Sequence, residues 1–359
     1  MKLRELIVIL FGFLLITSCE SADKVDGENE ISARGKFEPA DGKCLLFVGQ
    51  DMGAIGGLDD YNDGYADHFE TPAGITIYTN FHTKTSDGNA GIFSKANWGA
   101  GDCYADLQVK DETFANSVLA IGLEIVGAEQ DIVNGKADHL IEELGSWMGD
   151  LSPRPIFLRI GYEFDGHAWN HYSLTYYTKA WRYIVDYLDA MKVENVAYVW
   201  QSMGSATKAD AMEEWYPGDR YVDWCAYSYF YQPDQEMITF ARKHQKPVFI
   251  AEATPVRMSG GSYLDCDLTN PVIARLVWDE WFVGLFETIE QNDDVVKALS
   301  YINVEWLAQE MWIDNATFQK VDSRIQESEY ITERWVQKIS DERYLKPSLD
   351  LFEQLNALE

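Results

Sequence analysis

The chain has 359 residues, enough for one large domain or two ordinary ones, and 47% of them are hydrophobic, which is typical of a protein that buries a core. With 29 Lys and Arg residues against 59 Asp and Glu residues, the formal net charge is -30. This charge repels phosphate backbones and anionic lipid surfaces, so the composition disfavours binding to nucleic acid or directly to a membrane. Aromatic residues make up 14% of the chain, and a surplus of Trp and Tyr suits a cleft that holds sugar rings as well as a core.

The N-terminus predicts a targeting segment rather than part of the fold. Lys2 and Arg4 precede an apolar run over 6–16, which is too short to cross a bilayer as a helix but has the length of a signal-peptide core. The next residues, Leu-Ile-Thr-Ser-Cys, resemble the lipobox of bacterial lipoproteins, whose cysteine becomes the lipidated first residue. We therefore expect a lipoprotein signal peptide over 1–18 and lipidation of Cys19, with an ordinary secretory signal as the alternative.

This leader implies where the protein is found. We expect an exported protein that is lipid-anchored to the bacterial outer membrane, in the periplasm or at the cell surface, and that meets the membrane only through Cys19. Residues 19–40 are polar and almost free of large apolar side chains, which predicts a flexible tether.

Short β-rich apolar runs recur eight times after the tether. They cover 44–48, 75–79, 118–123, 156–160, 196–200, 222–227, 248–251 and 299–304. Amphipathic helices with a period near 3.6 lie between several of them, notably over 137–151, after Ser173, and from Pro271 onwards. Strands that alternate with helices predict parallel βα units, and eight units predict a closed (β/α)8 TIM barrel.

We expect this α/β barrel to form a single domain over 41–359, because no internal repeat and no linker-like break follows the tether. An open doubly wound sheet is the competing fold. The stretches 80–117 and 305–340 are too long for simple connections, so they predict loops that shape one face of the barrel.

The cysteines left after processing do not predict a metal site. Cys44 and Cys225 lie in predicted strands, and Cys103 and Cys266 lie in loops, where an exported protein could oxidise them to a disulfide or leave them free. The segment 59–70 has the glycine and closing glutamate of a calcium loop but lacks an oxygen ligand at its third position, so it predicts a polar loop instead. We expect no metal and no cofactor.

Two glutamates end predicted strands. Glu163 closes the fourth strand and Glu252 closes the seventh. In a (β/α)8 barrel the chemistry lies at the C-terminal strand ends, and a buried carboxylate needs a partner or a function. Glycoside hydrolysis requires two facing carboxyl groups, one to protonate the leaving oxygen and one to attack or stabilise the anomeric carbon.

The alternative is that each glutamate is a buried structural residue, satisfied by backbone groups and by an arginine. Alternation along the fourth strand puts Arg159 and Glu163 on the same side, so we expect the guanidinium to lie beneath this carboxylate in the barrel interior.

Three segments carry a family resemblance. Residues 159–166, Arg-Ile-Gly-Tyr-Glu-Phe-Asp-Gly, followed by Trp169, resemble the acid/base segment of glycoside hydrolase family 26, the β-mannanase and β-1,3-xylanase family. Residues 215–224 resemble the family's lead into strand six, and residues 246–252, Lys-Pro-Val-Phe-Ile-Ala-Glu, are similar to its nucleophile strand. The match covers about 150–255.

This resemblance implies a (β/α)8 barrel and a retaining mechanism, with Glu163 as acid/base and Glu252 as nucleophile. Two positions depart from the family pattern: Tyr162 stands where the family commonly has His, and Asp165 stands where it has Asn. The resemblance therefore indicates the type of reaction and leaves the glycan open.

Further side chains are candidates for the substrate site. We expect Arg159, with Tyr227 or Tyr229 of strand six, to hold Glu252 ionised and aligned. Other aromatic residues near strand ends are candidates for contact with sugar, although packing in the core is the alternative for each; they are Tyr162, Trp169, Trp200 and Trp306.

Together these patterns predict a monomeric, retaining endo-glycoside hydrolase that cleaves a polysaccharide such as β-mannan, β-1,3-xylan or a related plant or algal glycan. A surface lipoprotein that binds glycan on the same barrel without catalysis is the alternative. The presence of both glutamates favours the enzyme.

Overall fold

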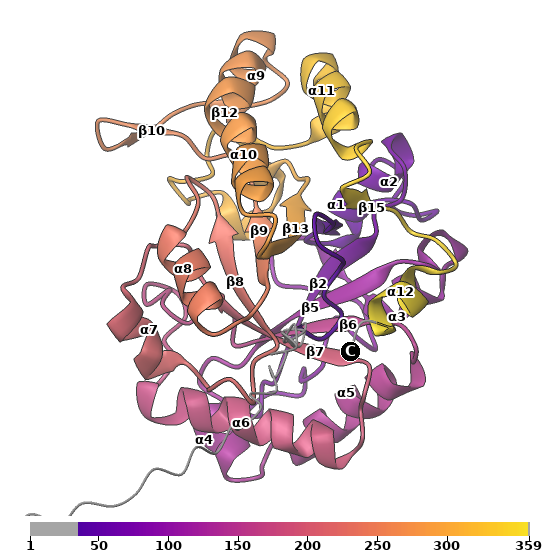
Figure 1. The fold of residues 1–359 in the computed structure, drawn as a ribbon, viewed down its shortest axis with the longest axis vertical. Helices are drawn as coiled ribbons and strands as arrows, with labels where there is room; N and C mark the ends of the chain where they lie inside the picture. Colours follow the sequence, from indigo (N-terminus) through magenta and orange to yellow (C-terminus); the bar gives the residue numbers. More distant parts are fainter. Residues whose placement is uncertain (1–34, 358–359) are drawn as a thin grey trace, which may run out of the picture. The chain divides into compact units, whose positions relative to one another are not determined.

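The computed structural model describes residues 35–357, so the predicted signal peptide, Cys19 and most of the tether lie outside the described residues. Within this range a parallel sheet closes on itself, because β13 pairs with β1 (Figure 1). The strands of the closed ring are β1 (Cys44–Gly49), β2 (Gly74–Asn80), β5 (Val118–Glu124), β6 (Ile156–Ile160), β7 (Val196–Ser202), β8 (Trp224–Tyr229), β9 (Val248–Ala253) and β13 (Val296–Ile302). The predicted (β/α)8 barrel is confirmed, and the open doubly wound sheet is excluded.

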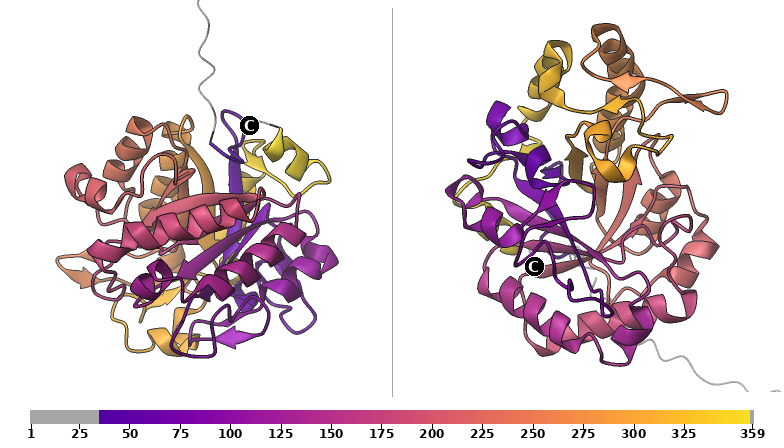
Figure 2. Two further views of the ribbon diagram at one scale, coloured as in Figure 1. Left: turned by 90° about the horizontal axis from the view of Figure 1, so that it is seen from below. Right: turned by 180° about the vertical axis from the view of Figure 1, so that it is seen from behind.

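Helices connect these strands and cover the outside of the ring (Figures 1 and 2). They are α1 (Met52–Ile55), α2 (Tyr65–His68), α3 (Ala105–Lys110), α4 (Glu129–Val133), α5 (Asp138–Asp150), α6 (Leu174–Ala190), α7 (Ala209–Trp215), α8 (Gln235–Lys243), α9 (Pro271–Val277), α10 (Val283–Gln291), α11 (Glu329–Ile339) and α12 (Leu351–Asn356). A π-helical segment, Trp278–Phe282, joins α9 to α10. The helices expected over 137–151, after Ser173 and from Pro271 are α5, α6 and α9.

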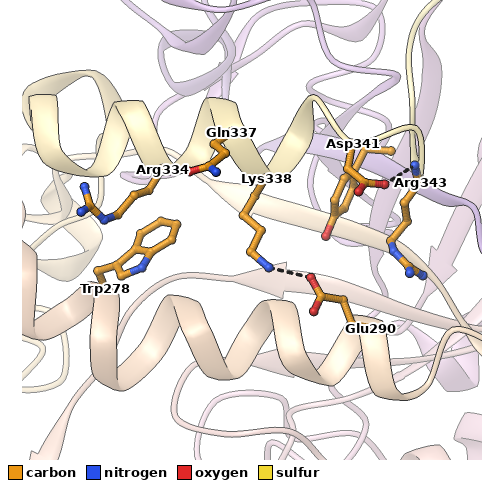
Figure 3. A pocket seen from close by; sticks show the side chains of 8 residues that line it. Trp278, Glu290, Arg334, Gln337, Lys338, Asp341 and Arg343 are labelled. Atoms are coloured by element: carbon orange, nitrogen blue, oxygen red, sulfur yellow. Dashed lines mark hydrogen bonds and ion pairs between the residues drawn. The ribbon is translucent and has the colours of Figure 1, made fainter.

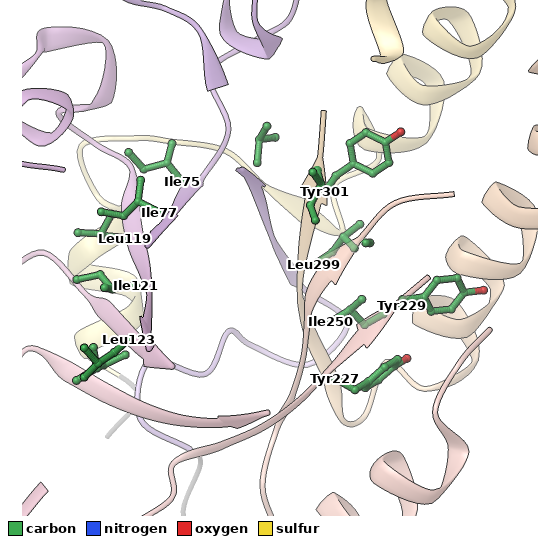
Figure 4. Close-up of a cluster of buried hydrophobic side chains, with 14 of the residues drawn as sticks. Ile75, Ile77, Leu119, Ile121, Leu123, Tyr227, Tyr229, Ile250, Leu299 and Tyr301 are labelled. Atoms are coloured by element: carbon green, nitrogen blue, oxygen red, sulfur yellow. The ribbon is translucent and has the colours of Figure 1, made fainter. Parts of the chain in front are cut away.

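Side chains alternate between the two faces of the barrel wall. Outward-facing residues such as Ile75, Ile121 and Leu299 pack under the helices in the large core cluster, which Figure 4 shows around the strands. Inward-facing residues belong to a separate cluster that includes Phe157 and Trp224. This period of two decides which strand residues can reach the interior and the mouth of the barrel.

Aromatic rings fill the half of the barrel interior nearest the N-terminal ends of the strands, which we call the lower half. Phe157 lies at its centre, with ring centroids 5.5 Å from Phe47, 5.2 Å from Trp224 and 6.1 Å from Phe249. Phe37 covers this group from below, 6.1 Å from Phe157, and the Trp224 indole donates to the backbone oxygen of residue 36. Residues 35–40, which the sequence assigns to the tether, are therefore part of the folded unit.

The two long stretches expected as loops contain short elements. Residues 80–117 include α3 and a small hairpin of β3 (Ala96–Asn97) and β4 (Asp102–Cys103). Residues 305–340 include α11 and β14 (Val321–Asp322), which pairs with β12 (Cys266–Asp267). Another hairpin, β10 (Met258–Ser259) with β11 (Ser262–Tyr263), follows β9.

A polar groove of about 370 Å³ lies on the outside of the barrel between α10 and α11 (Figure 3). Lys338 of α11 pairs with Glu290 of α10 across it at 2.6 Å. Tyr344, which also lines the groove, belongs to β15 (Tyr344–Leu345), which pairs with the first residues of β1. The groove therefore lies toward the N-terminal ends of the strands and shares no residue with the two glutamates.

The described residues also bear on three smaller expectations. Cys44, Cys103, Cys225 and Cys266 are all free and buried, so the disulfide left open between Cys103 and Cys266 is absent. Within 35–357, no three His, Cys, Asp or Glu residues gather as a metal site would require. None of the helices over the same range has the length and apolar character of a membrane span.

Candidate active site

Glu163 reaches the barrel mouth through an unusual turn directly after β6. Gly161 and Glu163 both have positive φ, at 52° and 53°. A side-chain-bearing residue rarely adopts this left-handed conformation, and such residues cluster at functional sites. Hydrogen bonds from the Gly161 N–H to Leu123 O and from the Phe164 N–H to Gln201 O fix the turn on both neighbouring strands.

Glu252 reaches the mouth through a bulge in β9. Phe249 and Ala251 face the barrel interior, so simple alternation would turn Glu252 outward. The pairing with β8 instead passes from Ile250 directly to Glu252 and leaves Ala251 as an extra residue. Such a bulge re-aims the following side chain, and here it directs the carboxylate into the barrel.

Every hydrogen bond that the described residues make to the Glu252 carboxylate falls on one oxygen, Oε1. Arg159 forms an ion pair with it from β6, Tyr78 donates at 2.9 Å from β2, and the Gln201 amide lies 3.4 Å away on β7. Burial raises the pKa of Tyr78 well above its ordinary value, so this hydroxyl stays protonated and can donate. Oε2 accepts no hydrogen bond from the described residues.

The environment of Glu163 favours a protonated carboxyl. Its side chain accepts from the Ser228 hydroxyl at 2.6 Å on Oε1 and from the Trp169 indole at 2.8 Å on Oε2, and the residue is 6% exposed. Burial, followed by the charge of Glu252, raises the pKa of Glu163 to about 8. A carboxyl of this pKa holds its proton near neutral pH, as a general acid must.

Ser228 shows that the two carboxyl groups are close together. Its hydroxyl bonds Glu163, while its Cα is the register partner of Glu252 on the adjacent strand. Adjacent strands lie about 4.8 Å apart. The two glutamates therefore converge at the C-terminal end of the barrel, as their positions at strand ends predict.

The structure changes the partner expected for Arg159. Its side chain is fully buried inside the barrel, as alternation predicts, but the guanidinium pairs with Glu252 and not with Glu163. The left-handed turn after β6 interrupts the alternation between Arg159 and Glu163, so the position of the guanidinium beneath Glu163 stays a prediction. The expectation that Arg159 holds Glu252 agrees with the observed ion pair.

The two tyrosines of β8 do not hold Glu252. Ala226 faces the interior, so Tyr227 and Tyr229 face outward and pack under the helices, where Figure 4 shows them. The ring centroid of Tyr229 lies 5.4 Å from that of Trp281. The tyrosine that does bond the carboxylate is Tyr78, from β2.

Trp200 and Trp306 lie in the core rather than in an open cleft. Trp200 is 0% exposed and stacks on Phe164 at 4.3 Å. Trp306 is 1% exposed, stacks on Phe318 at 3.8 Å and donates to the Thr254 hydroxyl at 3.1 Å. Because both indoles are covered, the structure does not support either as a sugar platform; Trp306 instead ties the loop after β13 to the end of the Glu252 strand.

Trp169 and Tyr162 lie where a substrate could contact them. Trp169 is 48% exposed and touches Glu163 through its indole N–H. A Cβ on Gly166 would come within 2.7 Å of this indole, so the glycine allows the ring to lie against the loop. The ring of Tyr162 packs edge-on against that of Tyr78, with centroids 5.4 Å apart. Contact of Trp169 and Tyr162 with sugar stays a prediction.

Asp165 organises the neighbouring loop. It accepts from the Ser202 hydroxyl and the Met203 N–H, both at 2.7 Å, and from the Thr207 hydroxyl at 2.6 Å. The carboxylate at this position, where the family commonly has Asn, therefore fixes the chain after β7.

Sequence reasoning missed three polar residues of the site: Tyr78, Gln201 and Ser228. Each occupies an inward-facing position near the C-terminal end of its strand. A polar side chain at that position was the available signal, because a buried polar group needs a partner.

Comparison with known proteins agrees with this geometry. The model of glycosyl hydrolase family 26 matches residues 109–311. The chain belongs to this family. This chain is 30% identical over 343 residues to the β-1,3-xylanase TXYA of Vibrio sp., and the match covers 89% of this chain and 70% of that relative. It is also 30% identical over 338 residues to a β-1,3-xylanase of Alcaligenes sp., covering 89% and 68%.

Solved structures of the family share the fold. GH26C from Muricauda sp. aligns with a TM-score of 0.58 at 14% identity, covering 89% of this chain and 90% of that one. The β-mannanase BoMan26A from Bacteroides ovatus aligns with a TM-score of 0.55 at 16% identity, covering 86% and 92%. The protein is thus a family 26 glycoside hydrolase on a (β/α)8 barrel.

Proposed function

We propose that this glycoside hydrolase is a retaining endo-β-1,3-xylanase that uses Glu163 as acid/base and Glu252 as nucleophile. The observation that carries the proposal is that the two carboxyl groups lie in different environments. Glu163 has a pKa raised to about 8, whereas Glu252 is paired with a buried arginine. A carboxyl held protonated suits the general acid, and a carboxylate aligned by an ion pair suits the nucleophile.

The reaction follows from these contacts. Glu252 Oε2 attacks the anomeric carbon while Glu163 gives its proton to the glycosidic oxygen, which leaves with the electron pair of the broken bond. Arg159 and Tyr78 hold Oε1 and keep the carboxylate aligned during the attack. Glu163, now a carboxylate, takes a proton from water, whose oxygen displaces Glu252 and restores the original anomeric configuration.

Membership of family 26 favours retention over inversion. Retaining enzymes have carboxyl groups about 5–5.5 Å apart, whereas inverting enzymes leave room for a water between them. Ser228, bonded to Glu163 and in register with Glu252, brings the two carboxyl groups near each other, as both mechanisms require.

The choice of β-1,3-xylan rests on the two relatives at 30% identity, both β-1,3-xylanases. The mannanases among the solved structures are less than 20% identical, so they support the fold and not a mannan substrate.

The test is a panel of β-1,3-xylan, β-1,4-xylan and β-mannan, assayed by release of reducing ends and by NMR of the first anomer formed. We expect cleavage of β-1,3-xylan with the β-anomer appearing first. Glu163→Gln and Glu252→Gln should each lower kcat by at least about 10²-fold.

Glu129→Gln is the matched control. Glu129 is also a buried glutamate, but it bonds the backbone N–H of Ser173 at the start of α6. Wild type that binds glycan without releasing reducing ends would support the non-catalytic alternative. An α-anomer as first product would contradict retention.

We also propose that the protein is exported and anchored by lipid on Cys19, because a short apolar leader ends in a lipobox-like sequence. Metabolic labelling with a fatty acid tests this. We expect label in wild type and none in Cys19→Ala, which should move from the membrane to the soluble fraction. Label retained by Cys19→Ala would contradict the proposal.

A further inference from the structure

A chain of hydrogen bonds links the two glutamates, and the donor in each bond can be assigned. The Nε of Arg159 can only donate, and it lies 2.8 Å from the side-chain oxygen of Gln201. This bond fixes the orientation of the amide, so the Gln201 nitrogen faces the other way. That nitrogen donates to the Ser228 hydroxyl at 3.0 Å.

The orientation of Gln201 determines the direction of the Ser228 proton. The hydroxyl oxygen accepts from the amide, and the amide nitrogen cannot accept in return. Among the contacts of the described residues, the acceptor within reach of the Ser228 hydroxyl is Oε1 of Glu163, at 2.6 Å. Ser228 therefore donates to Oε1 of Glu163, as the Trp169 indole donates to Oε2, so each oxygen of this carboxyl already accepts one hydrogen bond.

We propose that Ser228 is a positioning residue that holds Oε1 of Glu163 and stabilises the carboxylate that remains after proton transfer. The other oxygen, Oε2, accepts from the half-exposed Trp169. Arg159 and Gln201 act through Ser228 by fixing the direction of its hydrogen bond. The inference rests on the proposed role of Glu163 as the acid.

The proton balance of the reaction fits this arrangement. In the first step the proton leaves the Glu163 carboxyl for the glycosidic oxygen, and the Ser228 bond becomes a bond to a charged carboxylate, which strengthens it. In the second step the carboxylate takes a proton from water and the bond from Ser228 weakens again. Ser228 therefore lowers the barrier to proton donation without exchanging a proton itself.

Several other groups act on the same carboxyl. Burial and the charges of Glu252 and Asp165 raise the pKa of Glu163, and the bonds from Ser228 and Trp169 lower it. The charged and titratable groups that act on it directly are Glu252 from β9 and Tyr162 and Asp165 from its own loop, while Arg159 and Tyr78 contact Glu252. Removing the Ser228 hydroxyl should therefore raise the pKa further.

The experiment compares Ser228→Ala with Ser228→Thr, which keeps the hydroxyl, and Ser228→Cys, which keeps a weaker donor. On the natural glycan we expect Ser228→Ala to lower kcat/KM by about tenfold and to move the alkaline limb of its pH profile upward by roughly one unit. Ser228→Thr should restore both values, and Ser228→Cys should lie between them.

An aryl glycoside with a strongly activated leaving group separates acid catalysis from general damage. Its departure needs little protonation, so the loss in kcat/KM for Ser228→Ala should shrink to about twofold. Ser300→Ala is the matched control, because Ser300 is another buried hydroxyl of the barrel interior, bonded to Thr76 at 2.8 Å. We expect it to leave the pH profile unchanged.

A readout without turnover completes the test. The carboxyl C=O band of Glu163, isolated by infrared difference between each protein and its Glu163→Gln form, should titrate at higher pH in Ser228→Ala than in wild type. An unchanged midpoint, or equal losses on activated and natural substrates, would overturn the proposal. Wild type that cleaves no glycan would instead overturn the proposed function, and the infrared midpoint would still decide the role of Ser228.

Discussion

The lower and upper halves of the barrel interior are built from the same strands but have opposite chemistry. Below, inward-facing Phe157 and Phe249 pack ring against ring in a dry core. Two or three residues further along the same strands, Arg159 and Glu252 form a buried ion pair. The fold thus places a close-packed apolar layer directly beneath a polar layer.

The contrast between the two halves predicts that substitutions in the upper, polar layer should reduce activity most. Arg159→Leu removes the partner of Glu252 and leaves a buried carboxylate unpaired. We expect kcat to fall by about 10³-fold and the free energy of unfolding to fall by about 3 kcal/mol. Assays on glycan and urea unfolding measure the two effects. Arg159→Lys, which keeps the charge but loses the forked donor, should lose less of each; full activity in Arg159→Leu would contradict the assigned role.

Changes in the lower layer should reduce stability and spare the chemistry. Phe157→Ala removes the ring at the centre of the aromatic cluster. We expect the free energy of unfolding to fall by about 3–5 kcal/mol, with kcat within a few-fold of wild type at a temperature where the variant is folded. Phe157→Leu should lose less stability because it fills more of the space. A large loss of kcat in folded Phe157→Ala would show that the two layers are not separable.

The raised pKa of Glu163 predicts a pH-dependent cost in stability. The unfolded chain releases this proton near the ordinary value of 4.5, whereas the folded protein holds it until about pH 8. Between these values the free energy of unfolding should fall as pH rises, by about 1.4 kcal/mol per pH unit at most. Glu163→Gln lacks this proton, so its stability relative to wild type should increase from pH 5 to pH 8 and then level off. Parallel stability curves for the two proteins would contradict the raised pKa.

The smallest effect is expected at the edge of the polar layer. Trp169→Phe keeps a ring at the cleft but removes the indole donor to Glu163. We expect kcat/KM to fall roughly fivefold, or about 1 kcal/mol, and the alkaline limb of the pH profile to move upward. A loss of the same size in Trp169→Phe without a shift in that limb would indicate that the indole contacts only the sugar.

Much of the site could be predicted because the sequence shows where the strands end. The eight apolar runs, the closing glutamates and the inward position of Arg159 follow from hydrophobicity and a period of two. The direction of individual side chains was harder to predict. Alternation along the strands places Trp200, Tyr227 and Tyr229 on the outer face of the barrel, and the structure has them there. The prediction that they contact substrate followed their aromatic character instead.

The sequence by itself determined the order of the strands, the closed barrel and the presence of two carboxylates at its mouth, because these depend on patterns local to each segment. Only the tertiary structure decided which way the carboxylates point and what they bond. The bulge at Ala251 and the left-handed turn at Glu163 are set by pairing with neighbouring strands. The partners Tyr78 and Ser228 come from strands distant in the chain, so no local pattern contains their contacts.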